Sequence, residues 1–238
     1  MASLLLTVVL MAILVMAASA GEKPARLIVM LGGVFPAGII QGVTYFLFFW
    51  GIFEIAAINL KLRYESQAFD HHYLVEDKEW LYSADDAYQL KKMLEEKNKH
   101  SHYQLVNLAI MVCVKYRLSK SSSEALSMLE SEAANMSAEV ESDQSFIRYI
   151  SWAIPSVGFI GTVLGIASSL GYANQASTPE GIEKVTSALA VAFDTTLVAL
   201  VLSVVLMLTI HTLQKRQDNL YIQMKTYILH NLINRLYK

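Results

Sequence analysis

Four apolar runs, each long enough to cross a lipid bilayer, constrain this chain more than any other feature. A membrane-spanning helix needs about 20 predominantly apolar residues, and residues 1–20, 27–60, 147–172 and 185–213 form such runs. The composition agrees, because 54% of the residues are hydrophobic and 17% are charged, whereas soluble domains carry about a quarter charged residues. We therefore expect an all-α, polytopic membrane protein with three to four transmembrane helices, in contact with the lipid bilayer.

The first two runs each contain a complication. Residues 18–20, Ala-Ser-Ala, resemble a signal-peptidase site, but no Lys or Arg precedes the apolar run. We favour a retained membrane helix over residues 1–20, with an uncleaved or cleaved signal-like segment as the alternative. In the second run, Gly32-Gly33 and Pro36 are expected to break the helix. A re-entrant or interfacial segment should then lead into a span whose best core is residues 37–58.

Basic residues predict the orientation of the spans. Lys and Arg are concentrated in residues 61–146 and 214–238, whereas residues 173–184 contain one basic residue. The positive-inside rule therefore predicts that residues 61–146 and 214–238 are cytoplasmic and that the loop 173–184 is extracytoplasmic. Lys23 and Arg26, between the first two runs, oppose an outer location for that linker and weigh against a count of four spans.

Residues 61–146 are expected to form a cytoplasmic helical domain. Residues 83–99 begin with Ser83 and carry acids early and lysines late, which suits a capped helix and its dipole. Residues 105–115 are apolar enough for a packed core helix. A further helix is expected to begin near Glu124 and to continue into the third span, because no Pro or Gly occurs between Gly51 and Arg148. Long helices should thus extend from the membrane into this domain.

The C-terminal tail, residues 214–238, predicts an amphipathic helix. Apolar residues recur at every fourth position, namely Leu220, Met224, Ile228, Leu232 and Leu236. This spacing places them on one helical face. We expect that face to pack against the loop helices or a neighbouring subunit, with a helix on the membrane surface as the alternative.

Several classes of function lack the residues they need. A single cysteine, Cys113, excludes an internal disulfide framework, and its apolar surroundings predict a buried, inert thiol. The adjacent histidines His71 and His72 lack the additional ligands of a metal site. The sequence has no phosphate-binding loop, dinucleotide-binding glycine pattern or serine-nucleophile motif. We expect no enzymatic activity, no metal, no cofactor other than a transported ion, and no nucleic-acid partner.

The third apolar run contains a pattern of small residues. Gly158, Gly161 and Gly165 follow one another at spacings of three and four, and Thr162 lies beside them. This spacing makes a smooth helical face that a second helix can approach closely. Pro155 removes one backbone hydrogen bond and favours a kink.

Residues 155–165 resemble the proline followed by G-x-x-G-T-V-x-G that is typical of the MotA/TolQ/ExbB proton channel family. In the fourth run, residues 196–199 (Thr-Leu-Val-Ala) resemble the family's T-x-x-G step, with Ala199 in place of the glycine. The order of spans, helical loop and tail is also similar. The resemblance is strong over residues 124–216 and architectural before them.

The resemblance implies an ion-driven motor or stator of the bacterial inner membrane. In that family, several copies, five in the best-described members, form a ring around a dimeric single-span partner of the MotB/TolR/ExbD type. The partner carries the aspartate that takes up H⁺ or Na⁺, and threonines of the ring line the ion path. By position these are Thr162 and Thr196. Flagellar rotation, import, envelope maintenance, gliding and phage defence stay open, and a non-conducting oligomeric scaffold or sensor is the alternative.

Asp194 departs from the pattern just described. An ionisable residue inside an apolar helix is by default a candidate functional residue, and Thr195 and Thr196 follow it directly. Asp194 and Thr196 point about 160° apart on an ideal helix. Asp194, together with Thr195, is therefore a candidate for an ion relay, but it can equally hydrogen-bond a neighbouring helix or lie nearer the aqueous edge.

Overall fold

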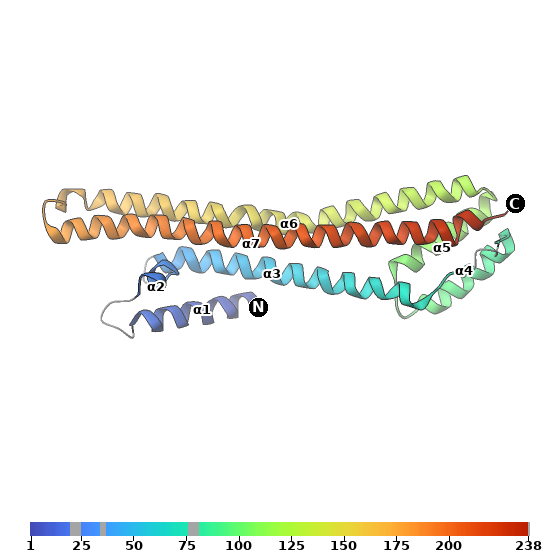
Figure 1. Cartoon of the computed structure of the whole chain (residues 1–238), viewed down its shortest axis with the longest axis horizontal. Coiled ribbons are helices and arrows are strands. Elements are labelled where there is room, and N and C mark those ends of the chain that lie inside the picture. The colour runs from blue at the N-terminus through green and yellow to red at the C-terminus, as the bar shows by residue number, and fades with distance from the viewer. Residues whose placement is uncertain (20–24, 34–36, 76–80, 238) are drawn as a thin grey trace. The chain divides into compact units, whose positions relative to one another are not determined.

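A computed structural model of the chain describes residues 1–19, 25–33, 37–75 and 81–237 (Figure 1). In these ranges the regular structure is helical, apart from an isolated bridge between Tyr82 and Leu236. The α-helices are α1 (Ala2–Ser19), α2 (Arg26–Met30), α3 (Ala37–Ser66), α4 (Ala84–Asn98), α5 (Gln104–Ser119), α6 (Ser122–Gly171) and α7 (Pro179–Asn231). Short 3-10 helices cover Gln67–His71, Ala173–Gln175 and Ile233–Arg235. The predicted all-α class is confirmed.

Among the described residues, four helices are long and apolar enough to cross a membrane, judged by length and composition. These four candidate spans correspond to α1, α3, α6 and α7. The three long helices α3, α6 and α7 continue well beyond the span length, and for α3 and α6 the absence of Pro and Gly between residues 51 and 148 predicts this. The chain is therefore a polytopic helical membrane protein whose long helices also carry its non-membrane segments.

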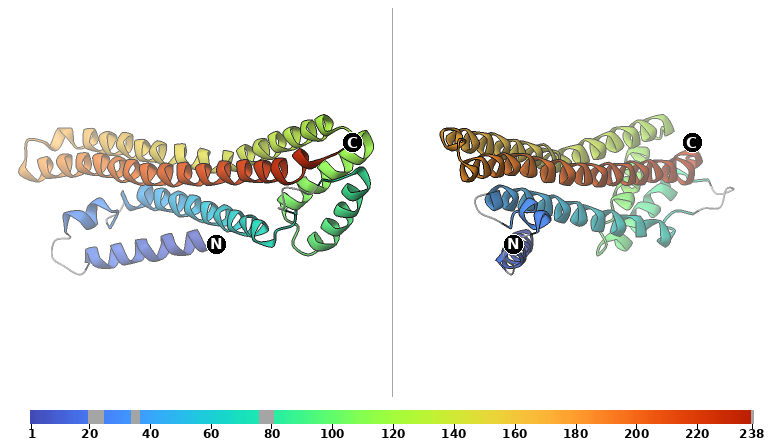
Figure 2. Two further views of the ribbon diagram at one scale, coloured as in Figure 1. Left: turned by 45° about the vertical axis from the view of Figure 1, so that its right-hand side comes forward. Right: turned by 60° about the vertical axis from the view of Figure 1, so that its left-hand side comes forward.

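The chain divides into two compact units, and α3, α6 and α7 contribute residues to both. The first unit comprises Met1–Ala56 and Ser145–His211, and the second comprises Ala57–Gln144 and Thr212–Lys238. In the first unit, α6 and α7 run antiparallel and side by side in every view (Figures 1 and 2). This pairing brings the third and fourth apolar runs of the sequence together.

Helix α1 packs against the other helices of the first unit. Leu14 of α1, Tyr45 of α3 and Val198 of α7 form a small buried cluster. Partly buried apolar side chains surround it: Leu10, Met11, Met30, Leu31, Phe49 and Leu202. Gly51 lets α3 approach α7 closely, because a Cβ at this position would lie 3.1 Å from the Leu206 side chain of α7.

The predicted break at the start of the second apolar run is present. Helix α2 ends at Met30, Gly32 takes a left-handed φ of +99° that suits glycine, and α3 begins at Ala37. Pro36, the third predicted breaker, lies outside the described residues. Backbone groups freed by such a break need protein partners inside a membrane. Side chains of α3 supply them, because the fully buried Gln41 donates to Met30 O and Tyr45 Oη donates to Leu31 O at 2.9 Å.

In the second unit, the capped helix predicted over residues 83–99 and the buried thiol predicted for Cys113 are both confirmed. Ser83 and Asp86 form a reciprocal capping box at the start of α4, and the hydrogen bonds from Ser83 lower the pKa of the Asp86 carboxyl. Asn98 joins α4 to α5, since Tyr103 N donates to Asn98 Oδ1 at 2.7 Å. Cys113 is fully buried, and burial raises its pKa to about 12. The thiol is therefore protonated at neutral pH.

The tail packs within the second unit as the C-terminal part of α7 followed by the 3-10 helix Ile233–Arg235. Leu220, Met224, Ile228 and Leu232 are all buried there, while Leu236 is partly buried. Burial of this stripe inside the protein favours the packed helix over a helix lying on the membrane surface. The tail is not a separate element, because α7 continues without interruption from the fourth apolar run to Asn231.

Helix α7 begins at Pro179, before the apolar run that starts at residue 185. Thr178 caps it, accepting a hydrogen bond from Gly181 N at 3.1 Å. A capping Thr, Pro at the first helical position and Glu180 in the first turn are a strong start signal. Hydropathy did not indicate this helix start, because residues 179–184 are mostly polar. The predicted loop 173–184 is therefore helical over its second half.

Candidate functional site

Thr162, in the first unit, lies near the middle of the third span. Trp152 of α6 and Tyr172, which directly follows α6, are exposed, and exposed aromatic residues are enriched at the two membrane interfaces. Tyr172 lies twenty positions after Trp152, which corresponds to about 30 Å at about 1.5 Å per residue and is about the thickness of the hydrocarbon core. Thr162 lies halfway between these two aromatic residues.

Three glycines bring α6 and α7 into close contact at this depth. Gly158, Gly161 and Gly165 are buried. A Cβ at Gly158 would lie 2.5 Å from Ala199 Cβ, and one at Gly165 would lie 2.6 Å from Ala192 Cβ. The glycine face is therefore the contact surface for α7, and Ala199 takes the small position of the T-x-x-G step. Helix α6 remains one helix through Pro155.

Thr162 and Thr196 face one another across this contact. Their hydroxyls form a short hydrogen bond with each other. Thr162 Oγ1 is also 3.1 Å from Ala192 O, and Thr196 Oγ1 is 2.9 Å from Gly158 O. Each hydroxyl has one proton and two lone pairs. The two hydroxyls have two protons for these three contacts, so one of the protons joins the two hydroxyls and the other is donated to a backbone carbonyl. The lone pairs that remain on the hydroxyl oxygens can accept a hydrogen bond or coordinate a cation.

Thr195 points to a different side of α7 from Thr196. Its hydroxyl is buried and donates to Ala192 O of its own helix at 3.0 Å. Its side chain also packs against Gly161. Thr195 is thus part of the same helix contact.

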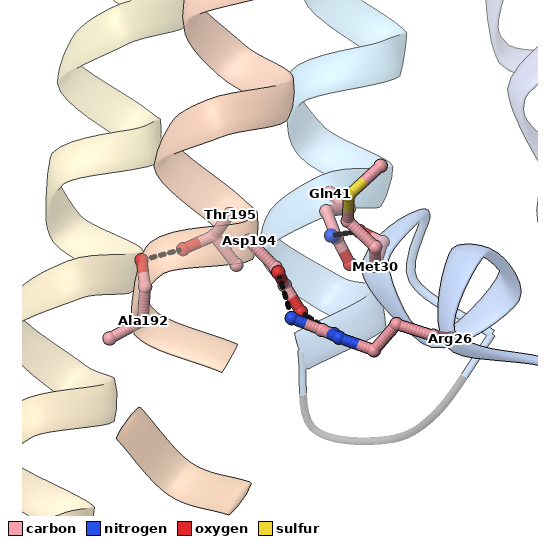
Figure 3. Close-up of polar contacts among 6 residues, drawn as sticks. All are labelled: Arg26, Met30, Gln41, Ala192, Asp194 and Thr195. Atoms are coloured by element: carbon pink, nitrogen blue, oxygen red, sulfur yellow. Dashed lines mark hydrogen bonds and ion pairs between the residues drawn. The ribbon is translucent and has the colours of Figure 1, made fainter. Parts of the chain in front are cut away.

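Asp194 forms an ion pair with Arg26 of α2 (Figure 3). The two guanidinium nitrogens lie 2.5 and 2.7 Å from the two carboxylate oxygens. The Asp194 side chain is 6% exposed, whereas that of Arg26 is 64% exposed. Of the three alternatives for Asp194, the structure shows hydrogen bonding to a neighbouring helical segment. The guanidinium neutralises a carboxylate that would otherwise be costly in an apolar helix.

Sequence reasoning missed Arg26 as a partner and treated it only as a charge in a linker. One signal was available, because Asp194 is the single acidic residue in the fourth apolar run. Buried carboxylates in such runs are normally paired, so a basic residue near another span was the natural partner. The two residues are separated by 168 positions, and spacing along the chain carries no information at that range.

The geometry defines a polytopic membrane protein with a polar hydroxyl pair enclosed between its last two spans. The sequence profile of the MotA/TolQ/ExbB proton channel family matches residues 86–226, more than half of the chain. The chain therefore belongs to this family, as the motifs in α6 and α7 predict. Comparison with curated proteins and with solved structures gives no match. Helices α1, α2 and α3 precede the matched residues.

Proposed function

We propose that this chain is the ring-forming subunit of an ion-driven motor or stator complex in the bacterial inner membrane. Several copies, five by resemblance to the family, surround a dimeric single-span partner of the MotB/TolR/ExbD type. The partner's aspartate carries H⁺ or Na⁺. Residues 61–146 and 214–238 lie in the cytoplasm, and the connection 173–184 lies outside.

The Thr162 and Thr196 pair is the observation that supports this proposal most strongly. Both residues fall within the family match, at the depth where a charge is most expensive. A neutral hydroxyl can accept a hydrogen bond from a protonated carboxyl or coordinate a cation without itself requiring a counter-charge. The pair therefore offers a weak, reversible binding position halfway across the membrane.

The driving force for each ion follows from its charge. A unit charge moving through 100 mV releases about 2.3 kcal/mol. Protonation or ion binding neutralises the partner's aspartate, which can then leave a polar position and pass the apolar surface between subunits. Repetition of this step around the ring turns one component against the other.

Asp194 and Thr195 were candidates for the same path, and their contacts support other roles. A carboxylate held by both guanidinium nitrogens of Arg26 is neutralised locally, so we assign Asp194 to anchoring α2 in the first unit. Thr195 is assigned to the helix contact and to the cavity described below. The ion path proper is assigned to Thr162 and Thr196.

Replacement of the hydroxyls by methyl groups separates a motor from a non-conducting scaffold. The chain is co-expressed with a single-span partner of the MotB/TolR/ExbD type, purified and reconstituted in liposomes. Ion uptake is then measured under an imposed membrane potential. Thr196→Val is expected to abolish uptake, and Thr162→Val is expected to reduce it at least tenfold.

Thr209→Val is the matched control on the same helix. The Thr209 hydroxyl donates only to Val205 O of its own helix, at 2.8 Å, so uptake should stay within twofold of the wild type. Uptake that is equal in Thr196→Val and Thr209→Val, in complexes of unchanged composition, would contradict a conducting role for the pair and support the scaffold.

A further inference from the structure

A cavity of about 530 Å³ lies inside the first unit, beside the helix contact. Its walls come from α2, α3, α6 and α7. Polar residues line it at the end nearest the α6–α7 connection: Ser168, Tyr172, Glu180, Glu183, Lys184 and Ser187. Its inner part is lined by apolar side chains and by Gly161 and Thr195.

With Lys184 and Tyr172 taken at the outer membrane interface, the cavity extends to the middle of the fourth span. Lys184 lies over the Tyr172 ring, with Nζ 5.8 Å from the ring centroid, which marks the outer end. Thr195 lies eleven positions after Lys184, which corresponds to about 16 Å along α7 at about 1.5 Å per residue. This is about half of the roughly 30 Å hydrocarbon core. The inner end therefore lies at the level of the Thr162 and Thr196 pair.

The distribution of polar groups suits water rather than a lipid chain at the outer end. Charged and hydroxyl-bearing side chains surround that end, and a hydroxyl recurs at the inner end, where Thr195 lies. At about 30 Å³ per water molecule in the liquid, the volume is enough for on the order of ten waters. A chain of waters can bridge the apolar middle between these two polar ends.

Helix α2 closes one side of the cavity. Val29 supplies that wall, opposite Leu164 and Val191. Three interactions hold α2 at this position: the ion pair of Arg26 with Asp194, and the hydrogen bonds from Gln41 and Tyr45 to its C-terminal end. A short helix that begins with a partly buried ion pair and ends on buried side-chain donors is a fixed structural element. Its place outside the family match makes it a feature of this chain's own N-terminal region.

We propose that this cavity is a water-filled access path through which a cation moves from the outer face of the subunit to the hydroxyl pair, with α2 as its wall. The proposal deepens the proposed function and rests on it, and on the outer location of residues 173–184. The substrate it admits is a hydrated monovalent cation or a proton carried along the waters.

Cysteine accessibility tests the path independently of ion transport. The native Cys113 is fully buried and its pKa is raised to about 12, so it contributes negligible background. Val191→Cys places a thiol on the inner wall of the cavity. Val163→Cys is the matched control, since Val163 is 51% exposed and points away from the cavity-lining residues of α6, towards lipid or a neighbouring subunit. Each full-length variant is reconstituted and treated from the outer side with a positively charged, membrane-impermeant methanethiosulfonate.

A water path predicts that the cysteine at 191 is modified at least tenfold faster than the cysteine at 163. Ser187→Cys, near the outer end, should react at least as fast as Val191→Cys. Reaction at 187 alone, with 191 as slow as 163, would overturn the proposal, because it would show a shallow depression that does not reach mid-membrane. The assay requires no partner and no flux. Failure here with Thr196→Val still inactive would remove the path and leave the proposed function intact.

Discussion

Replacing Gly158 by alanine is expected to separate α6 from α7 at the level of the hydroxyl pair. The new Cβ would lie 2.5 Å from Ala199 Cβ, whereas carbon atoms in contact prefer about 3.5–4.0 Å. The helices must therefore move apart by about 1 Å. Thr196 Oγ1 donates to Gly158 O at 2.9 Å, and a displacement of that size breaks this hydrogen bond.

The loss in the free energy of unfolding can be estimated from two effects, overpacking and the broken hydrogen bond. Overpacking of a close contact costs about 1–3 kcal/mol, and an interhelical hydrogen bond in a membrane protein contributes about 0.6 kcal/mol on average. We expect Gly158→Ala to lower the free energy of unfolding by about 2–3 kcal/mol. The second change Ala199→Gly should restore most of the loss, because the next neighbours of the new Cβ, Thr195 O and Thr196 Cα, are 3.3 Å away.

Unfolding in mixed micelles with increasing denaturing detergent, followed by circular dichroism, measures this cycle. Gly171→Ala is the control, because a Cβ at Gly171 has no neighbour within 4 Å, and its stability should stay within about 0.5 kcal/mol of the wild type. If Gly158→Ala is as stable as Gly171→Ala, or if Ala199→Gly does not rescue it, the close contact between α6 and α7 is refuted.

Four further predictions concern other parts of the chain. The double variant Arg26→Asp with Asp194→Arg should recover most of the thermal stability that each single change removes, by several degrees, in a melting assay; equal losses in all three variants would exclude the ion pair. The pKa of Asp86 is lowered from its ordinary 3.8 by Ser83, so its stabilising contribution is present above that pH and disappears as the pH falls through the lowered pKa; the Tm of Asp86→Asn should therefore fall less than that of the wild type between pH 5 and 3. Ser83→Ala should lower stability by about 1 kcal/mol at neutral pH in chemical denaturation. Cys113 should resist alkylation at pH 8 in the native protein and react after denaturation, as mass spectrometry can show, because a thiol of pKa about 12 has only about one part in ten thousand as thiolate.

Local sequence patterns predicted the elements that local physics determines. Span-length apolar runs gave the four candidate membrane helices, and Ser83 with its early acids gave the start of α4. The spacing of Gly158, Gly161 and Gly165 predicted the face that α7 contacts, because a stripe of small residues lets a second helix approach closely. The family motif also singled out Thr162 and Thr196, which the structure brings together.

Contacts between distant segments could not be derived in the same way. The ion pair of Arg26 with Asp194 depends on where α2 lies against α7, and no periodicity encodes that. Gln41 and Tyr45 read as polar exceptions in an apolar helix until the carbonyls of α2 appear beside them. The cavity has the same origin, since its lining residues come from four helices and only their packing makes a space.

We propose that Thr162 and Thr196 lie beside the single-span partner inside a ring of subunits. A photoreactive benzophenone amino acid incorporated at position 162, with the complex intact and illuminated in the membrane, tests this placement directly. A covalent adduct with the partner is expected from position 162 and none from position 163. Adducts with lipid alone from position 162, or equal yields of partner adduct from both positions, would contradict it.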